Sequence, residues 1–71
     1  MLWTFEKEGE KRVVEIRSSG DGRGFELRRL DTDGREVIEK FDTAEELRRR
    51  MTNVETELLK DGWSLAGTKR L

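Results

Sequence analysis

Two aspartates stand two residues apart in "LDTDGREV", residues 30–37, and these residue types come closest to a metal-binding motif. A calcium loop of the EF-hand kind needs oxygen ligands at alternating positions and a bidentate Glu at its twelfth residue. Asp31 and Asp33 fit the first two ligand positions, but Arg35 stands at the third and Asp42 where the Glu belongs. Asp followed by Gly between two alternating runs is typical of a hairpin turn, because Gly adopts positive φ without strain. We therefore predict a turn here, and no metal.

A second segment, "GDGRG" at residues 20–24, has the composition of a phosphate-binding loop. Such a loop must follow a strand and open a helix, so that backbone amides and the helix dipole face the phosphate. Here a strand-like run follows instead, and the motif is too short. We predict a flexible hairpin loop and no nucleotide cofactor.

Groups for catalysis are few. The chain contains no His for acid–base work near neutral pH and no Cys as nucleophile or zinc ligand. Ser18, Ser19 and Ser64 have no visible activating base, and the acidic residues lie in charged surroundings that would not shift their pKa. We expect a protein that is not an enzyme and uses no cofactor.

Basic residues cluster in "LRRL" and "LRRRM", residues 27–30 and 47–51. Binding single-stranded nucleic acid would combine them with exposed aromatic rings. Glu45 and Glu46, however, stand four residues before arginines of the second cluster, the favourable order for ion pairs along a helix. The aromatic rings are needed for the core, so we favour a self-paired, solvated helix face over a nucleic-acid site.

Length and composition limit the fold and the location. A chain of 71 residues is enough for one domain, residues 1–71. Its 32% apolar and 44% charged residues approach the disordered class, but the apolar residues are periodic. A net charge of −1 gives no general attraction to nucleic acid or anionic membrane, and no apolar run is long enough for a signal peptide or a membrane span. We expect a cytoplasmic protein, of a composition that resembles proteins from GC-rich bacteria.

Four runs alternate apolar and polar residues with the period of a strand: residues 2–7, 12–17, 25–30 and 35–41. Short turns between them predict an antiparallel meander. Residues 63–68 alternate again and could add a fifth strand.

The period changes after residue 41, where one stripe of a helix begins. Its members are Ala44, Leu47, Met51, Val54 and Leu58. Thr43 and Glu46 fit a capping box at its start, with Asp42 as the other candidate cap, and Gly62 fits a left-handed terminator at its end.

These elements predict an α+β fold in which the helix lies across one face of the meander. The residues expected in the core are Trp3, Phe5, Val14, Ile16, Phe25, Leu27, Val37, Phe41, Leu47, Met51, Val54 and Leu58, with Trp63 and Leu65 closing one end. Arg49 and Arg50 are expected to be exposed.

The segment "LLKDGWSLAGTKRL", residues 58–71, is similar to the ending of several small uncharacterised bacterial proteins, in which a helix runs into Gly-Trp and a short alternating strand. The resemblance implies a similar α+β module without a known activity. The order of strands and helix also resembles the single-strand nucleic-acid-binding folds of the Whirly kind, which is a likeness of topology alone.

The sheet face away from the helix is expected to carry four large aliphatic residues among charged ones. The candidate interface comprises Leu2, Val13, Arg17, Arg28, Leu30, Ile38 and Lys40. A second copy of the chain, another protein or residues 68–71 folding back could cover it, although single exposed apolar residues are also common on protein surfaces. We predict a non-catalytic interaction module that binds itself or a protein partner; the alternative is a single-stranded nucleic-acid-binding module that uses the basic sheet residues.

Overall fold

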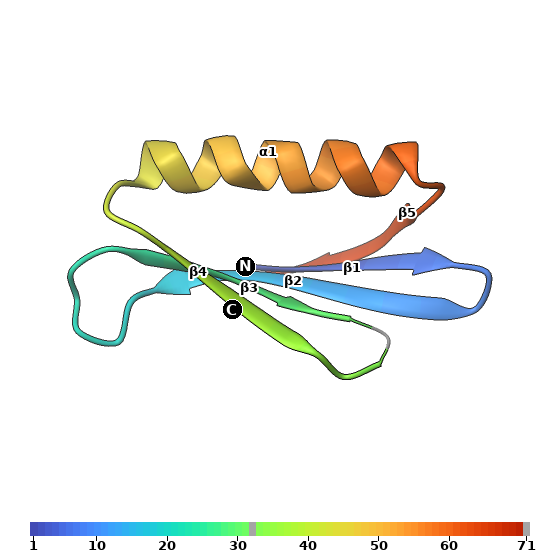
Figure 1. Cartoon of the computed structure of the whole chain (residues 1–71), viewed down its shortest axis with the longest axis horizontal. Coiled ribbons are helices and arrows are strands. Elements are labelled where there is room, and N and C mark those ends of the chain that lie inside the picture. Colours follow the sequence, from blue (N-terminus) through green and yellow to red (C-terminus); the bar gives the residue numbers. More distant parts are fainter. Residues whose placement is uncertain (32, 71) are drawn as a thin grey trace.

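A computed structural model describes residues 1–31 and 33–70 of the chain as one antiparallel sheet with one helix packed on it (Figure 1). The elements are β1 (Leu2–Lys7), β2 (Glu10–Ser18), β3 (Phe25–Leu30), β4 (Glu36–Phe41), α1 (Ala44–Lys60) and β5 (Ser64–Lys69). The strand order is β4-β3-β2-β1-β5. The predicted α+β fold is confirmed, including the fifth strand.

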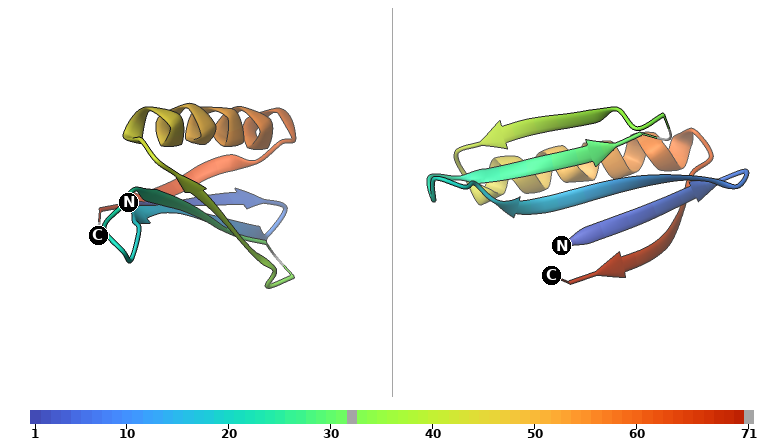
Figure 2. Two further views of the ribbon diagram at one scale, coloured as in Figure 1. Left: turned by 60° about the vertical axis from the view of Figure 1, so that its left-hand side comes forward. Right: turned by 90° about the horizontal axis from the view of Figure 1, so that it is seen from below.

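The connection through α1 carries the chain from one edge of the sheet to the other. β4 forms one edge, and after α1 the chain returns as β5, which pairs with β1 at the opposite edge. Two further views show α1 on one face of the sheet, and within residues 1–31 and 33–70 no element covers the other face (Figure 2). The fold therefore has two layers and leaves one side of its sheet open.

Both ends of α1 are fixed by residues that the sequence indicated. The Thr43 hydroxyl accepts a hydrogen bond from the backbone N–H of Glu46 at 3.2 Å, as a capping residue does. At the other end Gly62 has a φ of 93°, and the N–H of Trp63 donates to the carbonyl of Leu58 at 2.9 Å. This is a Schellman motif, and it turns Trp63 back under the helix.

The core lies between α1 and the sheet. Its buried members are Phe5, Val14, Leu27, Leu47, Met51, Val54, Leu58 and Trp63, with Trp3, Ile16, Phe25 and Phe41 packed against them. Two expected members are wrong: Val37 is 37% exposed and Leu65 is 48% exposed. Both belong to edge strands, and one helix is too narrow to cover the edges of a five-stranded sheet.

The helix arginines also differ from expectation. Arg49 pairs with Glu45 at 3.2 Å, as predicted. Arg50 was expected to be exposed, but it is half-buried, and its Nε donates to both carboxylate oxygens of Glu39 in β4, at 3.1 and 3.2 Å. The Thr43 hydroxyl donates to a carboxylate oxygen of Glu46 at 3.3 Å, so the carboxylate that the sequence places beside Arg50 lies at the start of the helix instead.

The stretch at residues 30–37 forms a turn between β3 and β4. The Gly34 N–H donates to the Asp31 carbonyl at 3.0 Å, and Gly34 has a φ of 85°. Asp33 uses a carboxylate oxygen to accept the N–H of Arg35 at 3.1 Å. These bonds agree with the predicted turn; Thr32 lies outside the described residues.

Two glycines of the loop between β2 and β3 provide a matched test of how closely this loop packs against the end of β4. Gly22 and Gly24 both have positive φ, 73° and 138°. A Cβ at Gly24 would collide with the backbone carbonyl oxygen of Phe41, whereas a Cβ at Gly22 meets nothing within 4 Å. We expect Gly24→Ala to lower the free energy of unfolding by more than about 2 kcal/mol and Gly22→Ala by about 1 kcal/mol, measured by urea denaturation. Equal losses in the two variants would contradict the close approach of this loop to the end of β4.

Candidate functional site

The sheet face opposite α1 holds all seven residues of the predicted interface. Leu2 lies opposite Glu15, Val13 opposite Leu30, and Arg28 opposite Ile38, and partners in a register point to the same side of a sheet. The structure therefore brings onto one surface Leu2, Val13, Arg17, Arg28, Leu30, Ile38 and Lys40. We call this surface the open face.

Apolar residues on the open face form a row across the strands. Thr4 of β1 pairs with Val13 of β2, which pairs with Leu30 of β3, and Gly67 of β5 extends the row beyond Thr4. The row ends at β4, where Glu36 lies opposite Leu30. Two adjacent aliphatic side chains, Val13 and Leu30, both half-buried, with the methyl group of Thr4 beside them, therefore make the continuous apolar part of this surface.

In the next row of paired residues, two charged side chains separate the other two aliphatic residues. Leu2 and Ile38 lie at its two sides, with Glu15 and Arg28 between them. Ile38 is 42% exposed, while Leu2 is half-buried. The predicted interface thus has an apolar centre with two outlying aliphatic residues.

The charged side chains of the open face pair within the sheet. A terminal nitrogen of Arg28 lies 2.7 Å from Glu36 and another lies 3.4 Å from Glu15. The hydrogen bond that Arg28 donates to Glu36, with the negative charge of Glu36 and Glu15, raises the pKa of Arg28 above its ordinary value. Arg17 donates from Nε to Glu26 at 3.0 Å.

The register makes the charge of the open face nearly balanced. Among the described residues it carries five basic side chains, Lys11, Arg17, Arg28, Lys40 and Lys69, and four acidic ones, Glu6, Glu15, Glu26 and Glu36. This surface therefore has no strong electrostatic preference for an anionic polymer.

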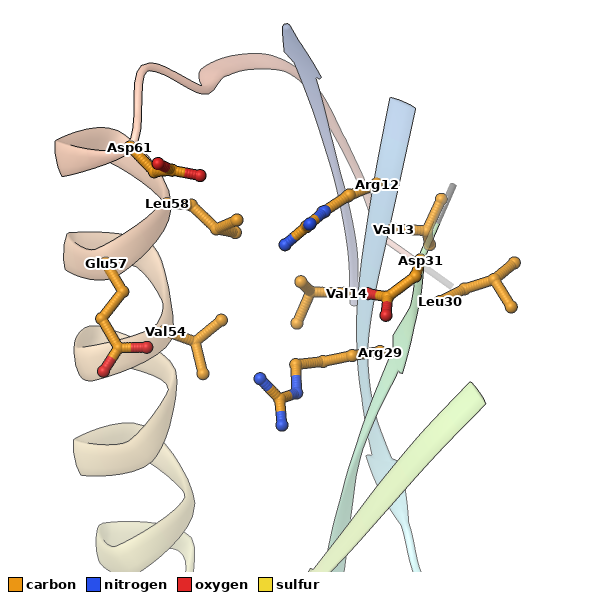
Figure 3. A pocket seen from close by; sticks show the side chains of 10 residues that line it. All are labelled: Arg12, Val13, Val14, Arg29, Leu30, Asp31, Val54, Glu57, Leu58 and Asp61. Atoms are coloured by element: carbon orange, nitrogen blue, oxygen red, sulfur yellow. The ribbon is translucent and has the colours of Figure 1, made fainter. Parts of the chain in front are cut away.

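A cleft of about 270 Å³ lies on the other side of the sheet, between the C-terminal half of α1 and strands β2 and β3 (Figure 3). Val14, Val54 and Leu58 supply apolar walls. Arg12 and Arg29 reach from the sheet toward the helix into the same space (Figure 3). The cleft therefore combines an apolar lining with two guanidinium groups.

The two arginines are held in different ways. The guanidinium of Arg12 lies over the Trp63 ring, 4.7 Å from its centroid. A terminal nitrogen of Arg29 lies 3.8 Å from Glu39. The Nε atoms of both arginines are buried and have no hydrogen-bond partner in the described part of the chain.

Alternation along β2 and β3 already indicates where these two arginines lie. Arg12 stands two residues before Val14, and Arg29 stands two residues after Leu27, so strict alternation places both on the core face. Arginines are usually assigned to solvent, and for that reason the candidate residues came from the open face alone.

Comparison with protein-family models, with curated proteins and with solved structures gives no match. The resemblance of residues 58–71 to small bacterial proteins therefore stays a prediction. Within residues 1–31 and 33–70, no three acidic side chains gather in a way that could hold a metal ion. The one helix described there is neither long nor apolar enough to cross a membrane.

Substitution of Glu39 tests whether its ion pairs with two arginines, at the edge of the buried core, stabilise the fold. It serves Arg50 and Arg29 while only 30% exposed, whereas Glu45 is 84% exposed and serves Arg49 alone. We expect Glu39→Ala to lower the free energy of unfolding by about 1 to 2 kcal/mol, because two half-buried guanidiniums lose their partner. The control, Glu45→Ala, should cost less than about 0.5 kcal/mol. Urea denaturation measures both, and a loss at Glu39 no larger than at Glu45 would contradict the shared role of this carboxylate.

Proposed function

We propose that this chain is a non-catalytic interaction module that forms a homodimer through the open face. The observation that carries the proposal is the row of Thr4, Val13 and Leu30, which crosses three neighbouring strands on a side of the sheet with no covering element among the described residues. Thr68 and Lys69 lie within β5 in the plane of the sheet, so they do not fold back over this face.

The exposed surface area of the chain supports the proposal that a second copy covers the open face. A folded monomer of 8.3 kDa should expose about 4,600 Å², whereas this chain exposes 5077 Å². Its radius of gyration, 12.2 Å, also exceeds the value of about 11 Å expected for 71 residues. Both differences are those of a two-layer fold whose sheet lacks a second cover.

The size of the open face fits a dimer. The molecule measures 38 by 21 Å along its two longest directions, which gives the face an outline of at most about 800 Å². One partner's share of a standard protein–protein interface is about the same. Two copies would therefore bury enough surface only by stacking their sheets with most of the two faces in contact.

The charge pattern favours a second copy over nucleic acid. A two-fold interface brings a surface against itself, so it requires both signs of charge on one face. The open face provides five basic and four acidic side chains in its described part. Single-stranded nucleic acid would instead need a set of unpaired cations, and the two arginines of the open face, Arg17 and Arg28, already pair with glutamates, which leaves mainly its lysines.

We infer a cytoplasmic, bacterial setting for this module. A chain without Cys suits a reducing compartment, and its composition resembles that of proteins from GC-rich bacteria. The absence of His and Cys also supports a role in binding and not in catalysis.

Sedimentation equilibrium of the wild type and two variants tests the dimer. At about 50 μM, which detects dissociation constants in the micromolar range, the wild type should be dimeric. Val13→Lys combined with Ile38→Lys should give a folded monomer, because each copy would place two new cations in the interface. Leu59→Lys is the matched control: Leu59 is 51% exposed on α1, away from the open face, and its replacement should leave the dimer intact.

A wild type that is monomeric at this concentration would overturn the homodimer. Titration with a labelled single-stranded oligonucleotide at several salt concentrations tests the alternative of nucleic-acid binding, since binding through phosphates weakens steeply as salt rises. Salt-sensitive binding that is lost in the Arg17→Gln, Arg28→Gln double variant would favour nucleic acid over a second copy.

A further inference from the structure

We propose that the cleft between α1 and strands β2 and β3 binds a small organic anion, a carboxylate or phosphate monoester with a short apolar body, between Arg12 and Arg29. This site lies on the helix side of the sheet and is independent of the open face, so it goes beyond the proposed dimer.

The positions of the two guanidiniums carry the proposal. Arg12 stands two residues before Val14 in β2, and Val14 pairs with Arg29 in β3, so the two arginines are diagonal neighbours on one face. Two like charges on diagonal positions at the margin of a core repel each other, and an anion placed between them relieves this repulsion. Arg12 forms no ion pair within the described residues, and Arg29 has a single contact, at 3.8 Å, with Glu39. Both oxygens of Glu39 already accept hydrogen bonds from Arg50.

The unpaired nitrogen atoms indicate the kind of ligand. A guanidinium binds a carboxylate or phosphate side-on through Nε and one terminal nitrogen, in a planar fork. Nε of Arg12 and Nε of Arg29 are both buried without a partner. A small rotation of either side chain toward the cleft would offer this fork to an anion and satisfy the buried donor, which costs about 1 to 3 kcal/mol when left unpaired.

The remainder of the cleft fits an apolar body. Val14, Val54 and Leu58 line it and are 2%, 2% and 8% exposed. Its volume of about 270 Å³ lies just below the range of about 300 to 1,000 Å³ that is usual for ligand pockets, so the ligand must be small. Stacking on Trp63 keeps the Arg12 side chain beside the cleft before the ligand arrives, which lowers the entropy lost on binding.

Three carboxylates also belong to the lining of the cleft. Asp61 has an oxygen 3.7 Å from the ammonium of Lys7, which also donates to the backbone carbonyl of Asp61. Asp31 lies at the end of β3, where its backbone closes the turn to β4. Glu57 is exposed on the helix wall and Asp31 is half-buried on the sheet side, and a ligand must outcompete both carboxylates. This competition is consistent with weak binding, in the millimolar to micromolar range.

NMR of the arginine Nε–Hε groups tests the proposal directly. Benzoate and phenyl phosphate are the two probes, and benzamide, of the same shape but uncharged, is the control. We expect either anion to shift the Arg12 and Arg29 signals saturably below about 10 mM, while benzamide does not. The tighter of the two anions identifies whether the natural ligand carries a carboxylate or a phosphate.

Three single variants distinguish binding in the cleft from unspecific binding elsewhere on the surface. Arg12→Gln and Arg29→Gln should each weaken binding at least about tenfold, the loss of about 1.4 kcal/mol expected when a charged fork is removed. Arg48→Gln, an exposed helix residue outside the cleft, should leave the affinity unchanged. Should the Gln variants fail to fold, Arg12→Lys and Arg29→Lys keep the charge without the fork and should still bind more weakly than the wild type.

Two results would overturn the proposal. One is the absence of saturable shifts with both anions at about 10 mM, which would leave the two arginines with the contacts they make within the chain. The other is equal affinity in the wild type and in folded Arg12 and Arg29 variants, which would place the anion elsewhere.

Discussion

The structure depends on one mismatch of size: a single helix must cover a sheet of five strands. A helix with its side chains is roughly 10 to 12 Å wide, whereas five strands spaced about 4.8 Å apart span roughly 20 Å. The buried core is therefore restricted to the strip under α1, where Phe5, Val14 and Leu27 are the most fully buried side chains. The edge strands extend beyond this strip, and for this reason Val37 and Leu65 remain exposed on the side that faces the helix.

Long polar side chains fill the margin of this strip. Arg29 and Arg50 approach Glu39 from the sheet and from the helix, so one carboxylate joins the two layers where apolar side chains would not reach. Arg12 extends along the layer boundary over Trp63, and its aliphatic stem can pack against the core while its charge reaches the cleft. The Arg50–Glu39 ion pair thus joins the two layers beside the core, and Arg12 and Arg29 line the cleft at another part of the same margin.

Periodicity was sufficient to predict the fold, but it did not predict which residues at the edge of the core are buried or which ion pairs they form. Alternation and the helical stripe located all five strands and α1, and the capping residues Thr43 and Gly62 fixed the helix ends. They could not show that Val37 lies beyond the reach of the helix, because alternation gives the face of a residue and not its distance from the layer above. Nor could they show that Arg50 turns to Glu39, since that contact joins residues eleven positions apart across two layers. The open face followed from alternation alone, whereas the cleft depends on the spacing between layers, which no local pattern contains.

Strands β2 and β3 contribute to both candidate surfaces, and they do so with consecutive residues. In β2, Arg12 lines the cleft and the next residue, Val13, lies in the apolar row; in β3, Arg29 lines the cleft and is followed by Leu30 in that row. Because neighbouring side chains of a strand point to opposite faces, a one-residue slip of register would place the arginines in the apolar row and the aliphatics in the cleft. The pairing of Val14 with Arg29 and of Val13 with Leu30 therefore fixes both surfaces at once. Val13 and Leu30 also border the cleft, so the open face and the cleft are two sides of the same two strands, while the arginines that would bind an anion belong to the cleft alone.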